Sequence, residues 1–183
     1  MNDSKKLSYA CKIFSVWEED VLLPNGRTVN QIWIEHQPTV AVAAVNHNQE
    51  LLLIRQFRKA TGKDLLEIPA GTMNKGEESP VACAMRELAE ETGFRAGRLS
   101  PLFAGYLVPG YCNEFMYFFL AQDLIYEPLP PDEDERIEVI PTRFSEARSL
   151  LENGTIIDAK TALGIILADN YLNSKTNFSK TPL

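Results

Sequence analysis

The chain has 183 residues, of which 45% are apolar, enough for one globular domain with a buried core. Its formal net charge of −7 argues against a nucleic-acid partner, because binding a phosphate backbone requires a basic face. A small phosphorylated ligand is not excluded, since bound cations can invert the local field. Three widely spaced cysteines form no disulfide framework and no metal-binding pair, which favours a reducing compartment. No signal segment or bilayer-spanning apolar run is visible, so we expect a cytoplasmic protein without membrane contact.

The first part of the chain is rich in β-forming residues. Residues 8–36 alternate loosely between apolar and polar side chains around a turn at Pro24-Asn25-Gly26, which predicts a pair of strands. Such a pair is too short to have a core of its own. We therefore expect residues 1–37 to form a small N-terminal β extension that packs on a second copy of the chain, giving a homodimer.

Strands and helices alternate along the rest of the chain. The four polar residues 46–49 separate two apolar runs and are typical of a β-hairpin. Ser79 is a favourable helix cap, Pro80 suits the first helical position, and Gly93 can close the helix in a left-handed conformation. This order predicts an α/β (α+β) fold with a mixed sheet over residues 38–172, followed by a tail over 173–183. The expected strands are 39–45, 50–58, 65–71, 99–108, 114–124 and 137–141, and the expected helices are 80–92, 145–152 and a last one capped by Asp158.

A cluster of acids lies on the predicted helix 80–92. Glu87, Glu90 and Glu91 have the spacing i, i+3 and i+4, so their side chains share one helix face. Three like charges on one face repel each other, and a divalent cation relieves that repulsion. Carboxylate oxygens suit Mg²⁺, with Mn²⁺ as the alternative. Taken alone, the pattern also fits a solvated helix face with Arg86 as the partner of the acids.

The residues before this cluster extend the pattern. Together with "EIPAGTMNKGEESP", the stretch "RELAEETGF" at 86–94 resembles the Nudix box. Its second half fits at every position. Gly71 lies one residue further upstream than the box requires, so either Glu77 or Glu78 fills the upstream acidic position. The resemblance implies a Nudix α/β/α sandwich and a metal-dependent hydrolase that acts on a nucleoside diphosphate linked to a further group.

Other stretches resemble the ADP-ribose pyrophosphatase branch of this family, which includes nucleoside-diphosphate-sugar hydrolases. They are "LIRQFR", "LLEIPAG", "VPGYCNEFMYFFLA", "DEDERIEV" and "NGTIIDAKTALGI", and the resemblance covers about residues 38–168. It implies hydrolysis of the diphosphate bond of ADP-ribose or a nucleotide sugar, giving a nucleoside monophosphate and a sugar phosphate. A preference for GDP-mannose, or a non-catalytic nucleotide sensor with the Nudix fold, is the alternative.

The resemblance also implies roles for particular residues. Arg58 resembles the arginine that contacts the diphosphate, as a guanidinium fork matches phosphate oxygens. Arg55 lies on the opposite face of the same strand and is either a second substrate contact or a surface charge. Glu67 either binds ribose hydroxyls or faces solvent. Arg86 orients the metal ligands, which are the carbonyl of Ala70 and the carboxylates of Glu87, Glu90, Glu91 and Glu114.

Two further expectations concern the base and the nucleobase. Glu133, or else Glu135, matches the carboxylate that activates water in this branch; alternatively the acidic loop 130–136 is only a lid and the base is a box glutamate. Arg27 is a candidate substitute for an arginine that many relatives carry near the end of the second N-terminal strand. Trp17 and Trp33 either stack on a nucleobase or pack in a core or interface.

Overall fold

Strands and helices alternate along residues 5–73, 76–130 and 136–174, the part of the chain that this computed structural model describes. The helices lie close to the positions expected from the sequence. Helix α1 is capped by Ser79, whose side chain accepts from the Ala82 amide, and it ends at Gly93 in the left-handed conformation, with φ 79°. The elements are β1 (Lys6–Ala10), β2 (Phe14–Leu22), β3 (Thr28–His36), β4 (Thr39–Ala44), β5 (Glu50–Arg58), β6 (Lys63–Glu67), β7 (Ala70–Thr72), α1 (Pro80–Thr92), β8 (Phe94–Tyr106), β9 (Phe115–Tyr126), β10 (Ile137–Arg143), α2 (Phe144–Glu152) and α3 (Ala159–Asn173).

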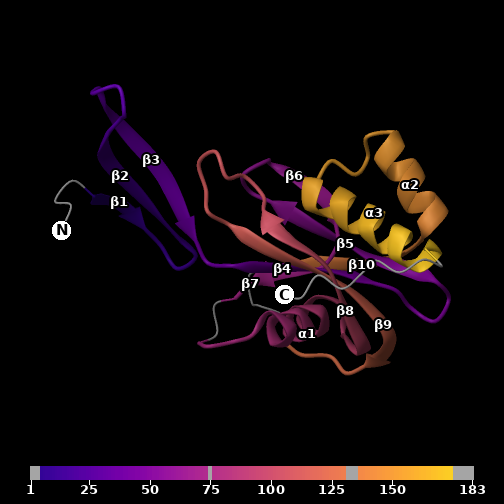
Figure 1. The fold of residues 1–183 in the computed structure, drawn as a ribbon. Coiled ribbons are helices and arrows are strands. Elements are labelled where there is room, and N and C mark those ends of the chain that lie inside the picture. The colour runs from indigo at the N-terminus through magenta and orange to yellow at the C-terminus, as the bar shows by residue number, and fades with distance from the viewer. Residues whose placement is uncertain (1–4, 74–75, 131–135, 175–183) are drawn as a thin grey trace.

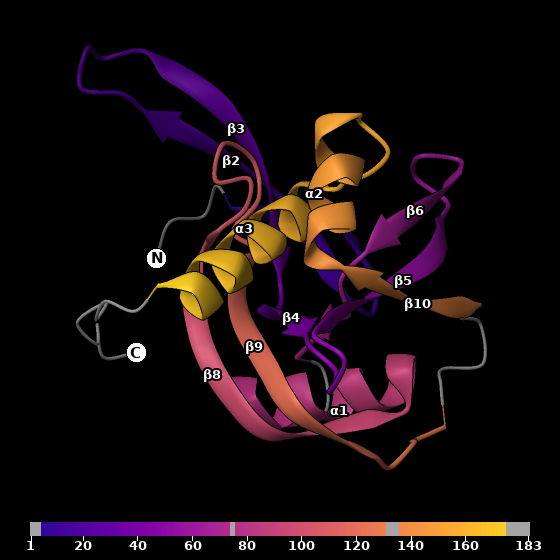
Figure 2. The same ribbon diagram turned by 90° about the vertical axis from the view of Figure 1, so that its right-hand side faces the viewer.

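The body of the molecule has three layers. Helix α1 covers one side of the central strands, and α2 with α3 cover the other (Figures 1 and 2). Successive strand residues point to opposite faces, so Phe118 joins the apolar cluster that includes Ile165 of α3, and Phe119 joins the cluster that includes Leu88 of α1. This arrangement confirms the predicted α/β/α layering.

The central strands are divided between two sheets, ordered β7-β4-β9-β8 and β10-β5-β6. The first sheet is mixed, because β4 and β9 run parallel while its other pairs are antiparallel. The predicted hairpin between residues 39–45 and 50–58 is wrong. The turn forms, but among the described residues a bridge between Val45 and Leu51 is the sole pairing of its two arms. Strand β4 pairs with β9 along one edge, and on the other edge Thr39–Ala41 pair with β7, so β5 pairs with β6 and β10 instead.

The segment predicted as one strand over 65–71 is two strands in different sheets. Strand β6 ends at Glu67 beside β5, and β7 begins at Ala70 beside β4. Pro69 lies between them and has no amide hydrogen to donate to a ladder. The chain thus crosses from one sheet to the other within three residues.

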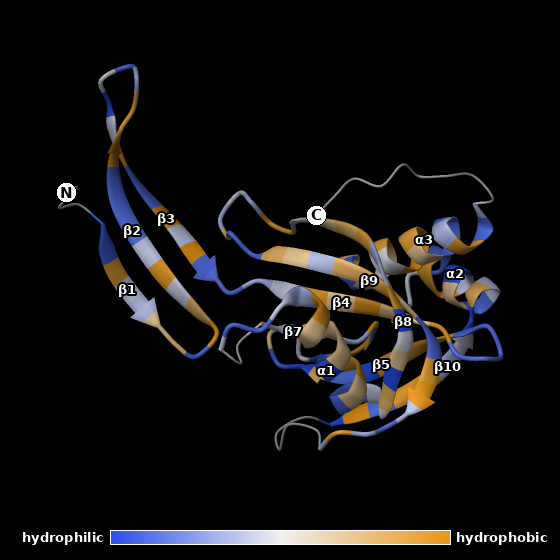
Figure 3. Cartoon of the chain, turned by 60° about the horizontal axis from the view of Figure 1, so that its bottom comes forward, coloured by the Kyte–Doolittle hydropathy of each residue, from blue (hydrophilic) through white to orange (hydrophobic). Residues whose placement is uncertain are grey.

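The N-terminal strands form a separate sheet, ordered β1-β2-β3, which projects from the body (Figure 1). Hydrophilic and hydrophobic residues alternate along β2 and β3 (Figure 3). The end of β3 is tied to the β8–β9 loop, since the Ile34 amide donates to the Tyr111 carbonyl at 2.7 Å and the Asn113 amide donates to the Ile34 carbonyl at 3.1 Å. Within the described ranges, no helix has the length and apolar character needed to cross a membrane.

Candidate functional site

Helix α1 presents a buried apolar side to the core and an acidic side to the preceding loop. Leu88 and Cys83 are fully buried against the sheet. Burial, reinforced by the negative charges of Glu87 and Glu78, raises the pKa of the Cys83 thiol to about 12, so this cysteine stays neutral. The polar side carries Arg86, Glu87 and Glu90, which are all mostly shielded from solvent.

Arg86 is the centre of the acidic cluster. Its Nε and Nη2 donate to the two carboxylate oxygens of Glu78, each at 2.9 Å. Its Nη1 donates to Glu87 at 2.6 Å and to Glu90 at 2.7 Å. Burial on its own would lower the pKa of Arg86, but the hydrogen bond with Glu78 and the charge of Glu87 outweigh it, and the pKa is raised. Arg86 therefore remains a cation that holds three carboxylates in place.

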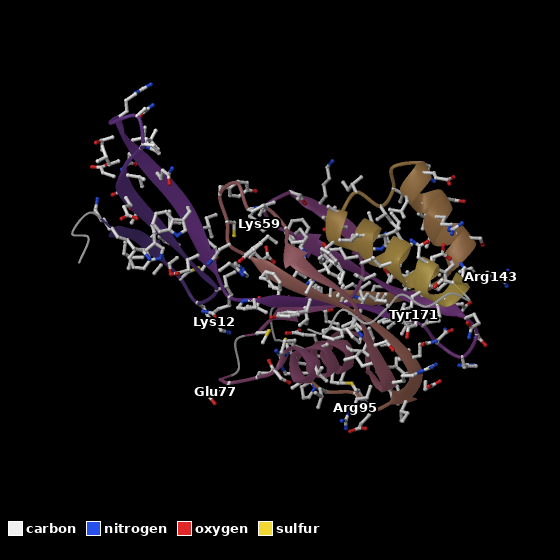
Figure 4. All side chains as sticks on the ribbon, viewed as in Figure 1. Lys12, Lys59, Glu77, Arg95, Arg143 and Tyr171 are labelled. Carbon is white, nitrogen blue, oxygen red and sulfur yellow. The ribbon has the colours of Figure 1, made fainter. Side chains whose placement is uncertain are left out.

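The structure distinguishes the two candidates for the upstream acid. Glu78 is mostly buried and forms the two-bond pair with Arg86. Glu77 is exposed and points away from the body (Figure 4). The additional loop residue is therefore accommodated between Gly71 and Glu78.

Strand β7 lies against the acidic side of α1. The Ala70 amide donates to the buried carboxylate of Glu91 at 2.9 Å. A Cβ atom at Gly71 would overlap the carboxyl group of Glu87, so a larger residue at this position would displace that carboxyl group. The strand and the helix thus bring Ala70, Glu87 and Glu91 together, as the box resemblance implies.

Glu114 occupies a different position, at the end of the β8–β9 loop. Its carboxylate accepts from the Thr39 hydroxyl at 2.9 Å. Thr39 is the first residue of β4 and is buried. Sequence reasoning missed Thr39, because a threonine at a strand start carries no signal for a partner 75 residues away.

The donor set fits a hard divalent cation by its chemistry. Glu87 and Glu90 converge on one nitrogen of Arg86, which shows that their oxygens can approach a single positive centre. Among the described residues, however, no three acidic, histidine or cysteine side chains are arranged as a ready-made metal site. Of the carboxylates that the sequence predicts as ligands, Glu87 and Glu90 accept hydrogen bonds from Arg86. Glu91 accepts from the Ala70 amide and Glu114 from the Thr39 hydroxyl.

Glu67 does not face solvent, so that alternative from the sequence is wrong. It is 1% exposed and accepts from Arg58 Nε at 2.8 Å, from Arg58 Nη2 at 2.7 Å and from Lys160. Burial raises the pKa of Glu67, but the hydrogen bonds from Arg58 and the charge of Lys160 outweigh it, and the pKa is lowered. The same hydrogen bond raises the pKa of Arg58.

Arg55 points to the other face of β5 from Gln56 and Arg58, as expected. It forms an exposed ion pair with Glu138 of β10 at 3.1 Å. This contact agrees with the surface-charge alternative.

Comparisons with known proteins agree with this geometry. The NUDIX domain model matches residues 35–161, which is more than half of the chain. The chain belongs to the NUDIX family. The ADP-ribose pyrophosphatase of Bacillus subtilis (strain 168) is 39% identical over 164 residues, which cover 88% of each protein. A GDP-mannose pyrophosphatase of Yersinia enterocolitica is 33% identical over 156 residues, covering 79% of this chain and 81% of the relative.

A solved structure is similar over most of the chain. The crystal structure of an ADP compounds hydrolase superposes with a TM-score of 0.78 at 28% identity, covering 93% of this chain and 92% of that one. The predicted family and its mixed α/β fold are thus confirmed.

The predicted nucleobase contacts lie on the N-terminal sheet, apart from the NUDIX box. Trp17 and Trp33 face each other across β2 and β3, and Lys5 Nζ lies 4.1 Å from the Trp17 ring centroid and 5.3 Å from that of Trp33. Trp17 Nε1 also donates to Glu35 at 2.8 Å. Arg27 is exposed in the β2–β3 turn, at the end of this sheet farthest from the body (Figure 1). Within one chain, the structure does not bring Arg27 to the box.

A pocket of about 660 Å³ lies between the N-terminal sheet and the β8–β9 loop. It includes Trp33 but none of the box acids. Its lining comprises Gln31, Ile32, Trp33, Tyr106, Pro109, Gly110, Tyr111, Cys112 and Asn113. The two expected bases, Glu133 and Glu135, lie outside the described residues.

Proposed function

We propose that this NUDIX protein hydrolyses the diphosphate bond of ADP-ribose or of another nucleoside diphosphate sugar. Water adds to one phosphorus and the bridging oxygen leaves with the other phosphate. With ADP-ribose the products are AMP and ribose 5-phosphate. The arrangement of Arg86 with Glu78, Glu87 and Glu90 carries this proposal, because it gathers three carboxylates around a single cation. Gly71 lies beside this cluster, and its lack of a side chain leaves room for the Glu87 carboxyl group.

Mg²⁺, with Mn²⁺ as the alternative, is the proposed cofactor. Glu87, Glu90 and Glu91 would hold it, together with the Ala70 carbonyl and Glu114. When bound, a divalent cation neutralises and polarises the diphosphate. Arg86 keeps the carboxylates oriented by charge-assisted hydrogen bonds, and the Ala70 amide fixes Glu91.

Two other groups act on the substrate and the water. Arg58 is the proposed diphosphate contact, since its guanidinium is partly exposed and stays charged. Arg55 is assigned no substrate role. Glu133 is the proposed general base and Glu135 the reserve, on the resemblance alone.

The nucleobase is the least specified part of the substrate. We assign Trp33 to it, because this ring lines the pocket beside the β8–β9 loop. Trp17 lies opposite Trp33 in the neighbouring strand, and Arg27 lies in the β2–β3 turn, far from the box of its own chain, so we assign it to the site of a second copy. A homodimer in the cytoplasm is therefore part of the proposal, in line with the free cysteines of the described residues.

GDP-mannose is the second candidate substrate, because a GDP-mannose pyrophosphatase is among the relatives. A panel of ADP-ribose, GDP-mannose and UDP-sugars tests both. Monoester products are measured with Mg²⁺, with Mn²⁺ and with a chelator. We expect turnover of ADP-ribose that the chelator abolishes and added Mg²⁺ restores. If the protein binds a compound of the panel but hydrolyses none of them, it is a nucleotide sensor and not an enzyme.

A further inference from the structure

A buried acid links three elements beside the NUDIX box. Glu67 at the end of β6 accepts hydrogen bonds from Arg58 at the end of β5 and from Lys160 in the first turn of α3. A buried carboxylate is strongly disfavoured unless cations and donors satisfy it. Here two cations do so, one of them 93 residues away in the sequence.

The pair with Glu67 fixes the orientation of Arg58. The carboxylate binds the Nε and Nη2 side of the guanidinium in a two-bond arrangement, which sets the plane of the group. No described residue is recorded as a partner of Nη1, and the Arg58 side chain is 36% exposed. The opposite side of the fork is thus available to phosphate oxygens. The charge of Glu91 contributes to the raised pKa of Arg58, so this arginine is within electrostatic range of the box.

Lys160 is fixed in turn by the start of α3. Asp158 caps this helix, and its Oδ2 accepts from the Thr161 amide at 2.9 Å and from Lys160 Nζ at 2.8 Å. The Thr161 hydroxyl accepts from the Ile68 amide at 2.9 Å, and Thr161 is fully buried. The first turn of α3 is therefore bound to the residue that directly follows Glu67.

We propose that Lys160 is a positioning residue that, held by Asp158, acts through Glu67 to keep Arg58 oriented toward the substrate diphosphate. Lys160 does not serve as a substrate contact itself, because its side chain is 12% exposed and its hydrogen bonds go to two carboxylates. This inference rests on the proposed function. It gives a role to the "DAKT" stretch at 158–161, which lies outside the NUDIX box.

The first test is the Lys160→Met variant, which keeps the apolar stem of the side chain and removes the charge. We expect KM for ADP-ribose to rise about tenfold or more, with a smaller change in kcat, as Arg58 loses its fixed orientation. Residues that orient a ligand-binding group typically change affinity or activity by about ten- to a hundredfold. A purely structural role would lower the folded fraction, and hence the apparent kcat, at an unchanged KM.

Arg148→Met is the matched control. Arg148 pairs with Asp169, a buried acid on the same helix α3, at a site that the proposed mechanism does not use. Arg148→Met removes a cation from the buried carboxylate of Asp169, as Lys160→Met removes one from the buried carboxylate of Glu67. We expect an unchanged KM. Lys160→Arg, which keeps the cation, should recover much of the lost affinity.

A double-mutant cycle with Arg58→Met separates action through Arg58 from independent damage. In the Arg58→Met background, Lys160→Met should cause little further loss of kcat/KM per folded molecule, with the folded fraction measured by thermal unfolding, because the double variant leaves Glu67 without either cation. Multiplying losses would overturn the inference. If Lys160→Met does not fold, the same kinetic measurements are made on Lys160→Gln. If neither variant folds while Lys160→Arg does, Lys160 has a structural role and the inference is overturned.

The outcomes distinguish this inference from the proposed function. No hydrolysis of any nucleotide sugar by the wild type would refute the function and the inference together. Normal hydrolysis by the wild type with an unchanged KM in Lys160→Met would refute the inference alone.

Discussion

The box glutamates are held by different partners, which determines what a substitution removes. Glu87 and Glu90 share Nη1 of Arg86, whereas Glu91 is buried and accepts from the Ala70 amide. Replacing Glu91 by glutamine keeps an oxygen that can accept this hydrogen bond. The change therefore removes the negative charge with little effect on the local structure.

We predict that Glu91→Gln lowers turnover on the order of a hundredfold or more, as losing a charged metal ligand weakens Lewis-acid catalysis. The melting temperature should stay close to that of the wild type. Initial rates at saturating Mg²⁺ and thermal unfolding measure the two effects. Glu77→Gln is the control, since Glu77 is exposed and points away from the body, and it should behave as wild type (Figure 4). Wild-type turnover by Glu91→Gln would contradict the assignment.

Gly71 offers a test that leaves every acid in place. In Gly71→Ala the new methyl group meets the Glu87 carboxyl group, which must move. We expect activity to fall roughly a hundredfold, the effect of displacing a reacting group by about 1 Å. Val81→Ala is the control, because Val81 is 51% exposed on the same helix α1 and belongs neither to the acidic cluster nor to the pocket lining. Steady-state kinetics of the two variants decide, and equal activity would argue against a catalytic role for Glu87.

Sequence patterns predicted the positions of residues where the signal was local. Ser79 and Gly93 cap the two ends of helix α1 as expected. Arg86 donates hydrogen bonds to Glu87 and Glu90. The alternatives for Glu67 could not be resolved in the same way. Its second cation, Lys160, comes from an element 93 residues away, and nothing in either local pattern links them.

The same limit applies to whole elements. Strands β4 and β5 were predicted from their apolar runs, but their partners were not, because β4 pairs with β9 and β7 and β5 pairs with β10 and β6. Likewise, the apolar residues of 65–71 predicted a strand. They did not indicate that Pro69 lies between two strands that belong to different sheets. Propensity and periodicity specify that a strand exists, whereas its neighbours depend on non-local packing.

The contact between β5, β6 and α3 makes stability depend on pH. The pKa of Glu67 is lower in the folded protein than in the unfolded chain. Its contribution to stability is therefore complete above the unfolded pKa, about 4.3, and is lost as the pH falls through the lower folded pKa.

We predict that Glu67→Gln lowers the free energy of unfolding by about 3–5 kcal/mol at pH 7, the usual effect of breaking a buried ion pair. The difference from wild type should shrink as the pH falls below about 4. Urea unfolding at a series of pH values measures both. Glu127→Gln, which breaks the exposed pair with Arg95, is the control and should change stability little. A difference that persists unchanged in acid would contradict this account.

The N-terminal sheet exposes apolar side chains along one face and has no buried core of its own within one chain. Among residues 5–38 no side chain is fully buried. Tyr9 lies opposite Val16, and Val16 lies opposite Ile34, so these residues share one face of the sheet. By strand alternation Ile32 lies on that face as well. A three-stranded sheet with exposed apolar residues and no core needs a partner surface for stability.

We predict that a second copy of the chain covers this face, so that the wild type has twice the chain mass by light scattering. Ile32 is 61% exposed, and Ile32→Asp places a charge on the face, which should shift the protein toward the monomer. Ile166→Asp is the control, because Ile166 is 52% exposed on α3 and belongs to the body. It should leave the dimer intact. A monomeric wild type at working concentrations would refute the dimer.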